Sequence, residues 1–217
     1  MSSSTVLVTG FDPFGGQAVN ASWAAVEALA ERWPADGPRL ETLRLPVTFA
    51  GAGPALRGAV EATRPDLVVC VGEAGGRDRI GLERVAVNVV DARIPDNGGA
   101  QPVDVPVVAG APTAYLSALP VKACVQALAR AGLPAEVSNT AGTYVCNAAF
   151  YALMHLVQGT GVRAGFVHVP RLAGDAADGP ASGAALTAEY LARGLDVIVR
   201  AALRTGEDLP LPGGVED

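Results

Sequence analysis

The stretch Leu67-Val68-Val69-Cys70-Val71 is followed at once by Gly72-Glu73-Ala74-Gly75-Gly76-Arg77. A short run of β-branched and apolar residues that ends in a glycine-rich turn is typical of a strand buried on both faces of a parallel sheet. Similar runs lie at residues 6–8, 43–47, 85–90 and 165–169. The sequence therefore predicts a sheet made of short buried strands.

Helical patterns separate these runs. Asn20 or Ser22 can cap the first helix, and Pro54 and Pro120 can open the second and third. The five expected helices cover about residues 21–33, 54–63, 121–131, 146–157 and 182–205. Strands that alternate with helices need crossover connections, so we expect an α/β fold. It would be a single domain over residues 1–208, with a mostly parallel twisted sheet and helices on both faces, an open α/β sandwich.

Three segments lack a helical or strand period. Residues 94–112 are rich in proline and glycine, and we expect a functional or subunit-contact loop there. Residues 170–180 have the composition of a mobile flap. Residues 209–217 have the composition of a flexible tail.

Charge and cysteine content exclude several classes of protein. The 217 residues carry a formal net charge of −6, which disfavours nucleic acid and anionic membrane surfaces as partners. The three cysteines form no CxxC pattern and no zinc-ligand spacing with the two histidines, so we expect reduced thiols and no metal site. Residues 1–5 are short and polar, and no apolar run is long enough to cross a bilayer. We therefore expect a cytoplasmic protein.

Few residues can carry acid/base or nucleophilic chemistry. His168 stands at the end of the apolar run 165–169, where open α/β sheets bind ligands, and is either a catalytic base or a core histidine. His155 lies inside an expected helix, which favours a structural role. Cys146 lies where a loop meets a helix, and the helix dipole there favours the thiolate and predicts a lowered pKa. The alternative for Cys146 is a buried thiol, which we expect for Cys70 and Cys124.

Glycines and aromatic residues gather after two of the runs. The glycines of residues 72–77 match neither nucleotide-binding loop pattern, so they indicate either an ordinary turn or a close backbone approach to a ligand. Residues 9–16, Thr-Gly-Phe-Asp-Pro-Phe-Gly-Gly, hold two of the five phenylalanines. Phe11 and Phe14 therefore cover the core or form the wall of a pocket.

With these residues in view, the sequence resembles the pyroglutamyl peptidase I family. The resemblance runs through residues 9–16, 72–97, 138–147 and 165–170, in the family's order. It implies a cytosolic cysteine exopeptidase that removes N-terminal pyroglutamate from peptides. It also implies a homotetramer that uses no cofactor.

The resemblance also implies roles for single residues. Cys146 corresponds to the nucleophile, His168 to its base and Glu83 to the residue that orients the imidazole. Arg93 falls where the family has an arginine near the oxyanion. The positions that line the pyrrolidone pocket in relatives are Phe11, Phe14, Asn20 and Glu73 in this chain.

Two positions depart from the family pattern. Relatives commonly have glutamine where this chain has Glu73, and many have histidine where it has Ala148. An ionised carboxylate can accept from a lactam N–H but cannot donate to a lactam carbonyl. We therefore expect Glu73 to alter affinity or pH dependence. Ala148 leaves the expected catalytic set intact.

Two other functions stay open at this point. A phosphorylase-like protein would bind phosphate through Arg77 or Arg93 and would need no thiol. A ligand-binding protein without activity would keep the pocket alone. Alkylation of the thiol separates the peptidase from the phosphorylase, and an intact set of Cys146, His168 and Glu83 argues against the inactive protein.

Overall fold

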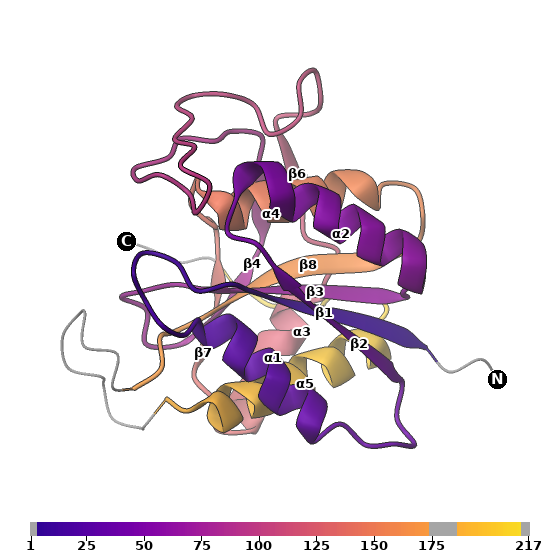
Figure 1. Ribbon diagram of the computed structural model, residues 1–217. Coiled ribbons are helices and arrows are strands. Elements are labelled where there is room, and N and C mark those ends of the chain that lie inside the picture. Colours follow the sequence, from indigo (N-terminus) through magenta and orange to yellow (C-terminus); the bar gives the residue numbers. More distant parts are fainter. Residues whose placement is uncertain (1–3, 174–185, 214–217) are drawn as a thin grey trace.

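The sheet at the centre of the molecule has six strands in the order β2-β1-β3-β8-β4-β7 (Figure 1). The computed structural model describes residues 4–173 and 186–213. The strands β2, β1, β3 and β8 are mutually parallel, whereas β4 runs antiparallel to β8 and parallel to β7. Their bounds are β1 (Thr5–Phe11), β2 (Arg39–Leu45), β3 (Leu67–Glu73), β4 (Ile80–Glu83), β7 (Ala135–Ser138) and β8 (Arg163–Val169).

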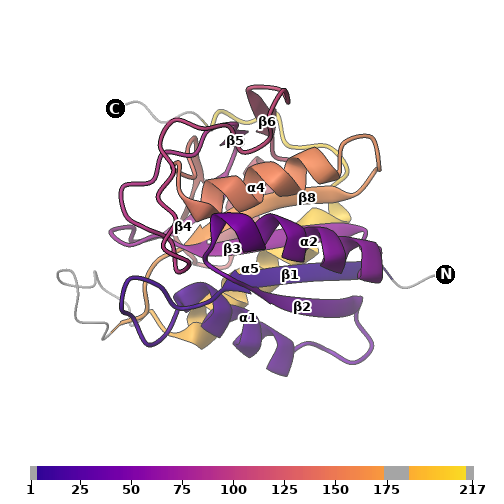
Figure 2. The ribbon, with the colours of Figure 1, turned by 45° about the horizontal axis from the view of Figure 1, so that its top comes forward.

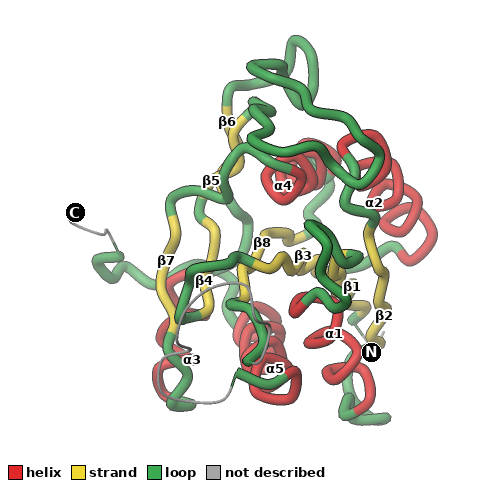
Figure 3. Tube along the Cα trace, turned by 60° about the vertical axis from the view of Figure 1, so that its left-hand side comes forward, coloured by secondary structure: helices red, strands yellow, loops and turns green. Residues whose placement is uncertain are grey.

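Helices cover both faces of this sheet. The helices α1 (Ala21–Glu31), α3 (Val121–Arg130) and α5 (Ala188–Arg204) lie on one face, and α2 (Phe49–Thr63) and α4 (Val145–Leu156) lie on the other (Figures 2 and 3). Two apolar clusters correspond to these layers. Val71 and Val167 pack toward α1 and α5, whereas Cys70 and Phe166 pack toward α2 and α4. The predicted single-domain α/β fold with a mostly parallel sheet is confirmed.

Caps fix where most helices begin. Asn20 caps α1, accepting from Ser22 N, and Thr187 caps α5, accepting from Tyr190 N. The predicted start of the last helix at residue 182 lies outside the described residues. The predicted start of the second helix at Pro54 is wrong, because Thr48 caps α2 one turn earlier and Pro54 lies inside the helix on its exposed side.

The prediction that residues 85–90 form a strand of the main sheet is wrong. Residues 85–90 do not enter the main sheet; instead, β5 (Val85–Val87) pairs with β6 (Ala114–Leu116) in a separate antiparallel ribbon. The main sheet takes β4 from the preceding residues, which carry Glu83. Four-residue strands such as β4 and β7 are too short to give a clear period in the sequence.

The connection from β5 to β6 is irregular, as predicted, and extends beyond α2 and α4 (Figure 1). Part of the predicted flap at 170–180 lies outside the described residues. Within residues 209–217, the Gly213 carbonyl accepts from Arg84 Nη2 at 2.8 Å, and the flexibility of this tail stays a prediction. In the part of the chain that the structure describes, no helix has the length and apolar character needed to cross a membrane.

Candidate active site

The end of β8 and the neighbouring antiparallel strand β4 bring the predicted acid/base pair together. Antiparallel pairing of β4 with β8 sets Gly81 opposite His168 and Glu83 opposite Phe166, so both polar side chains share the face that α4 covers. His168 Nδ1 lies 2.7 Å from Glu83 Oε1. Glu83 is fully buried and His168 is 4% exposed. This contact fixes the ring and leaves Nε2 as the nitrogen available for a reaction.

Cys146 reaches the same place from the start of α4. It is the second residue of the helix, and Tyr144 occupies the N-cap position without a side-chain hydrogen bond to the helix. Gly72 pairs with His168 across β3 and β8, and a Cβ atom on Gly72 would lie only 3.0 Å from Cys146 Sγ. The thiol therefore lies directly over β3, beside the strand position of His168. Glycine at position 72 allows this approach.

The pKa of Cys146 shifts in the direction opposite to the sequence prediction. Burial raises the pKa of the thiol to about 12, and the charges of Glu83 and Glu73 add to the rise, whereas Arg77 lowers it. Desolvation and two carboxylates thus outweigh the helix dipole. The resting thiol is protonated, so a base must remove its proton when the sulfur attacks.

A small pocket opens beside the thiol. It holds about 240 Å³ of empty space, part of it open to solvent. Its walls combine aromatic rings, short aliphatic side chains and few polar groups, from Phe11, Phe14, Asn20, Val47, Glu73, Tyr144, Val145 and Cys146. The structure therefore brings all four predicted pocket residues together with the predicted nucleophile.

Two of those pocket residues are engaged in bonds of their own. Asn20 donates through Nδ2 to the Asp12 carbonyl and accepts from Ser22 through Oδ1. The Glu73 side chain is fully buried, although the whole residue is 6% exposed, so the atoms it exposes belong to its main chain. The carboxylate has no exposed surface in the pocket, and Ala21 N at the start of α1 donates to its Oε2 at 2.7 Å. The expected contact between this carboxylate and a ligand stays a prediction.

The two arginines considered for phosphate binding lie in different surroundings. Arg77 donates to Glu83 Oε1 at 2.9 Å and to Ser138 Oγ and the Thr140 carbonyl at 3.2 Å each, so its guanidinium is committed to the acid/base pair. Arg93 is exposed. No hydrogen bond among the described residues brings its guanidinium to Cys146, and its oxyanion role stays a prediction.

Sequence reasoning missed two residues that shape the site. The Tyr144 ring lines the pocket and packs edge-on against Phe49, while its hydroxyl donates to the Pro95 carbonyl at 2.9 Å. The buried Asn147 amide bonds to Val87 and Val89 main-chain groups and ties the long connection to α4. The signal in the sequence was their position within two residues of Cys146 and inside the run 138–147 that carries the family resemblance.

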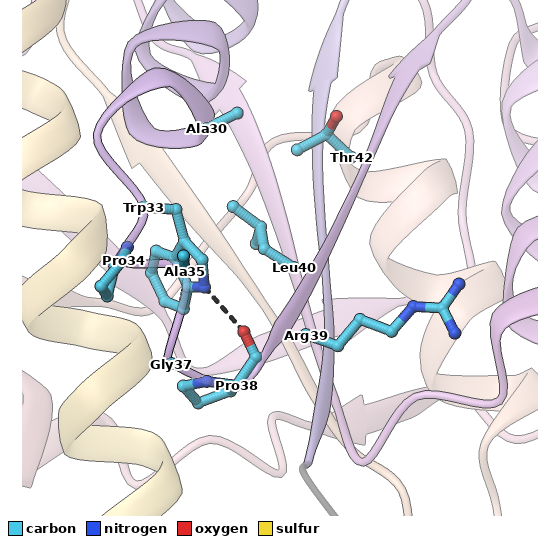
Figure 4. Close-up of a pocket in the computed structure, with 9 residues that line it drawn as sticks. All are labelled: Ala30, Trp33, Pro34, Ala35, Gly37, Pro38, Arg39, Leu40 and Thr42. Atoms are coloured by element: carbon cyan, nitrogen blue, oxygen red, sulfur yellow. Dashed lines mark hydrogen bonds between the residues drawn. The ribbon is translucent and has the colours of Figure 1, made fainter.

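Other candidate sites are weaker. Within residues 4–173 and 186–213, no three histidine, cysteine or acidic side chains gather to hold a metal ion. A larger hollow lies between the end of α1 and the start of β2, where Trp33 Nε1 donates to the Pro38 carbonyl (Figure 4). Arg39 in this hollow is the first residue of β2 and lies opposite the first residue of β1 in the sheet. The hollow therefore lies at the amino ends of the parallel strands, whereas Cys146 lies at their carboxyl ends. None of its nine lining residues is a nucleophile of the kind considered above.

Comparisons with known proteins agree with this geometry. The profile of the family described as "Pyroglutamyl peptidase" matches residues 4–205. The chain belongs to the pyroglutamyl peptidase family. A "Pyrrolidone-carboxylate peptidase" of Brevibacillus brevis is 45% identical over 212 residues, 97% of this chain and 98% of the relative. One from Streptomyces coelicolor is 51% identical over 202 residues, 92% of each chain.

Solved structures of the pyroglutamyl peptidase family share the fold. The crystal structure of pyroglutamyl peptidase I from Bacillus amyloliquefaciens superimposes with a TM-score of 0.90 at 38% identity, covering 97% of this chain and all of that one. A pyrrolidone carboxyl peptidase from Thermococcus litoralis gives 0.87 at 32% identity, over 96% and 99% of the two chains. The family resemblance seen in the sequence is confirmed along nearly the whole chain.

Proposed function

We propose that this chain is a cysteine peptidase that hydrolyses the amide bond after an N-terminal pyroglutamate residue. One observation carries the proposal. The Glu83–His168 contact of 2.7 Å lies on the same sheet face as the Cys146 thiol, which borders a small pocket of low polarity. A nucleophile, a base and a residue that orients the base form a set that can carry out acyl transfer.

Acylation begins with removal of the thiol proton. His168 takes the proton from Cys146 Sγ as the sulfur attacks the pyroglutamyl carbonyl carbon. Backbone N–H groups in the first turn of α4 have no helical acceptor and can hold the oxyanion, together with Arg93. The carbon–nitrogen bond then breaks, and His168 gives its proton to the departing amine. The product on the protein is a thioester between Cys146 and pyroglutamate.

Deacylation uses the same residues with water. His168 takes a proton from water, the oxygen attacks the thioester carbonyl, and the carbon–sulfur bond breaks. The proton returns to the Cys146 sulfur. Glu83 holds the ring through Nδ1 and stabilises the charged imidazolium in both steps.

The pocket suits a blocked N-terminus. Pyroglutamate has no ammonium group, so a carboxylate that holds a charged N-terminus is of no use, and a neutral apolar slot must select the ring. Phe11 and Phe14 lie on the pocket wall with Tyr144, and the Phe14 and Tyr144 ring centroids are 6.4 Å apart. Aromatic faces of this kind can pack against a flat lactam ring.

Release of aminocoumarin from its pyroglutamyl amide tests the proposal, with prolyl and glutamyl amides as comparison substrates. The expected result is turnover of the pyroglutamyl compound with little release from the others. Cys146→Ala and His168→Ala are each expected to lower kcat by about 1,000-fold or more. Cys124→Ala, a change at a buried thiol of another helix, serves as the matched control and keeps activity. Turnover of the prolyl compound alone would refute the specificity.

We also propose that the chain acts as a homotetramer in the cytoplasm, with pyroglutamyl peptides as substrates. Apolar side chains exposed on and near the long connection support self-association, with Val103 60% exposed and Leu116 69% exposed. The three cysteines form no disulfide, which suits a reducing compartment. Light scattering of the purified protein measures the assembly directly.

A further inference from the structure

A buried carboxylate stands directly behind the wall of the proposed substrate pocket. Glu73 is the last residue of β3, and its side chain has no exposed surface. Its Oε2 accepts from Ala21 N, in the first turn of α1, at 2.7 Å. Its Oε1 accepts from Gln17 Nε2 at 3.2 Å and from Arg171 Nε at 3.1 Å. Three donors thus converge on one carboxylate, and one of these three is a cation.

The sheet brings Arg171 to this position. Ala74 N donates to the Val169 carbonyl at 2.9 Å, so β3 and β8 stay paired up to the residue after Glu73 and to within two residues of Arg171. Gly75 provides the space for the guanidinium, because a Cβ atom there would lie 3.1 Å from Arg171 Cζ. The Arg171 side chain is 26% exposed, so this ion pair has only one solvent-accessible partner. Pairs of this kind are much less screened than surface pairs.

The ion pair matters because the pocket has to exclude substrates that carry an ammonium group. Cys146 and Tyr144 line the same pocket as Glu73, and the substrate ring must lie between them and the phenylalanines. An uncompensated carboxylate at this wall would attract the ammonium group of an unblocked N-terminus. It would also oppose ionisation of the nearby thiol. A pocket for a neutral ring therefore requires this negative charge to be cancelled and held away.

We propose that Arg171 is a positioning residue that determines specificity: together with the start of α1, it holds the Glu73 carboxylate behind the pocket wall and cancels its charge. The pocket then admits an uncharged N-terminal ring and rejects a free ammonium group. This inference rests on the proposed peptidase function. It assigns the specificity to an ion pair and not to a contact between Glu73 and the substrate.

The experiment compares Arg171→Met, Arg171→Lys and the double variant Glu73→Gln/Arg171→Met with the wild type. Arg79→Met is the matched control, because Arg79 is exposed and pairs with the adjacent Asp78 outside the pocket. The readouts are kcat and KM for pyroglutamyl- and prolyl-aminocoumarin, with circular dichroism to verify folding. Prolyl-aminocoumarin has the same ring size but carries an ammonium group.

Arg171→Met is expected to raise KM for the pyroglutamyl substrate about tenfold and to move the preference about tenfold toward the prolyl substrate. Arg171→Lys keeps the charge and is expected to fall between Arg171→Met and the wild type. The double variant has a neutral side chain at position 73 and is expected to restore both values to within about threefold of the wild type. A merely structural arginine would not be rescued by a change at Glu73.

Other outcomes overturn the inference. It fails when Arg171→Met behaves like Arg79→Met, and also when the loss in Arg171→Met persists in a folded double variant. Where Arg171→Met does not fold, the double variant decides alone: wild-type preference supports the inference, and lost preference refutes it. A wild type without pyroglutamyl turnover refutes the proposed function instead. Calorimetric binding of pyroglutamate and of proline then tests the pocket without turnover.

Discussion

Nδ1 of His168 lies 2.7 Å from Oε1 of Glu83, and that same carboxylate oxygen also accepts from Arg77 Nη1 at 2.9 Å. The second oxygen, Oε2, is buried and has no hydrogen-bond partner among the described residues. The orientation of the carboxylate thus depends on two donors that share one atom. Arg77 therefore holds Glu83 in place through a hydrogen bond that does not involve the imidazole.

Replacing Arg77 with methionine is expected to lower kcat about 10- to 100-fold and to leave KM for the pyroglutamyl substrate nearly unchanged. The reason is that Glu83 loses the donor that fixes Oε1, so the imidazole loses its fixed orientation, while the pocket itself is untouched. Steady-state kinetics with the aminocoumarin substrate measure both constants. A rise in KM with kcat preserved would mean that Arg77 acts on substrate binding.

Gly72→Ala tests the close approach of the thiol to β3. The added Cβ atom would lie 2.7 Å from Phe166 Cζ and 3.0 Å from Cys146 Sγ, so the sulfur must move. We expect kcat/KM to fall about tenfold or more, because the Phe166 ring must shift, the sulfur must give way by a few tenths of an ångström, and catalysis is sensitive to small displacements of the reacting atom. Thermal unfolding and kinetics of the variant provide the measurement.

A glycine on α2 provides the control for that substitution. A Cβ atom added to Gly58 would meet no neighbouring side chain or packed element within 4 Å, so alanine there fits without strain. Gly58→Ala is expected to stabilise the fold by about 0.5–1 kcal/mol with activity unchanged. Equal activity in the two alanine variants would show that the thiol does not depend on Gly72.

The fold could be predicted where a side-chain pattern was long enough to repeat. Five-residue runs such as 67–71 mark the strands that the sheet buries, and Asn20 marks the start of α1. The strand β4, which carries Glu83, could not be predicted in this way, because Ile80-Gly81-Leu82-Glu83 has only four residues. Its place in the sheet depends on pairing with β7 and β8, which are distant in sequence.

The site could be predicted as a set of residues but not as an electrostatic environment. Position at a helix start suggested a lowered pKa for Cys146, and burial raises it instead. The Glu73–Arg171 pair joins residues that are 98 positions apart, and no local pattern links them. Long-range contacts of this kind set desolvation and charge compensation, which a sequence pattern does not report.

Alkylation by iodoacetamide tests the protonation state of the thiol. Burial raises the pKa of Cys146 to about 12, so at neutral pH the reactive thiolate is a minor species. We expect one modified residue per native chain, because Cys70 and Cys124 are fully buried. The rate is expected to rise about tenfold for each pH unit between about pH 7 and 9. A rate that is already constant below pH 8 would indicate a preformed thiolate.

Asp96 links acid stability to the loop whose Pro95 carbonyl accepts from the pocket residue Tyr144. Its carboxylate accepts from Gly98 N and Ala100 N through Oδ1 and from Phe49 N, the first residue of α2, through Oδ2. Burial raises the pKa of Asp96, but backbone N–H bonds from Phe49, Ala100, Gly98 and Gly99 outweigh it and hold the pKa below its usual range. The ionised carboxylate therefore stabilises the folded state.

The sign of the pH dependence follows from that direction. The folded-state pKa is lower than the unfolded-state value of about 3.9, so the stabilisation is present above that pH and is lost as the pH falls through the folded-state pKa. Asp96→Asn turns an amide N–H₂ group toward one backbone donor and is expected to cost about 1–2 kcal/mol near pH 7. The difference from the wild type in urea unfolding should shrink below about pH 4. Asp36→Asn, at an exposed site, is the control, and a difference that grows at low pH would contradict the assignment.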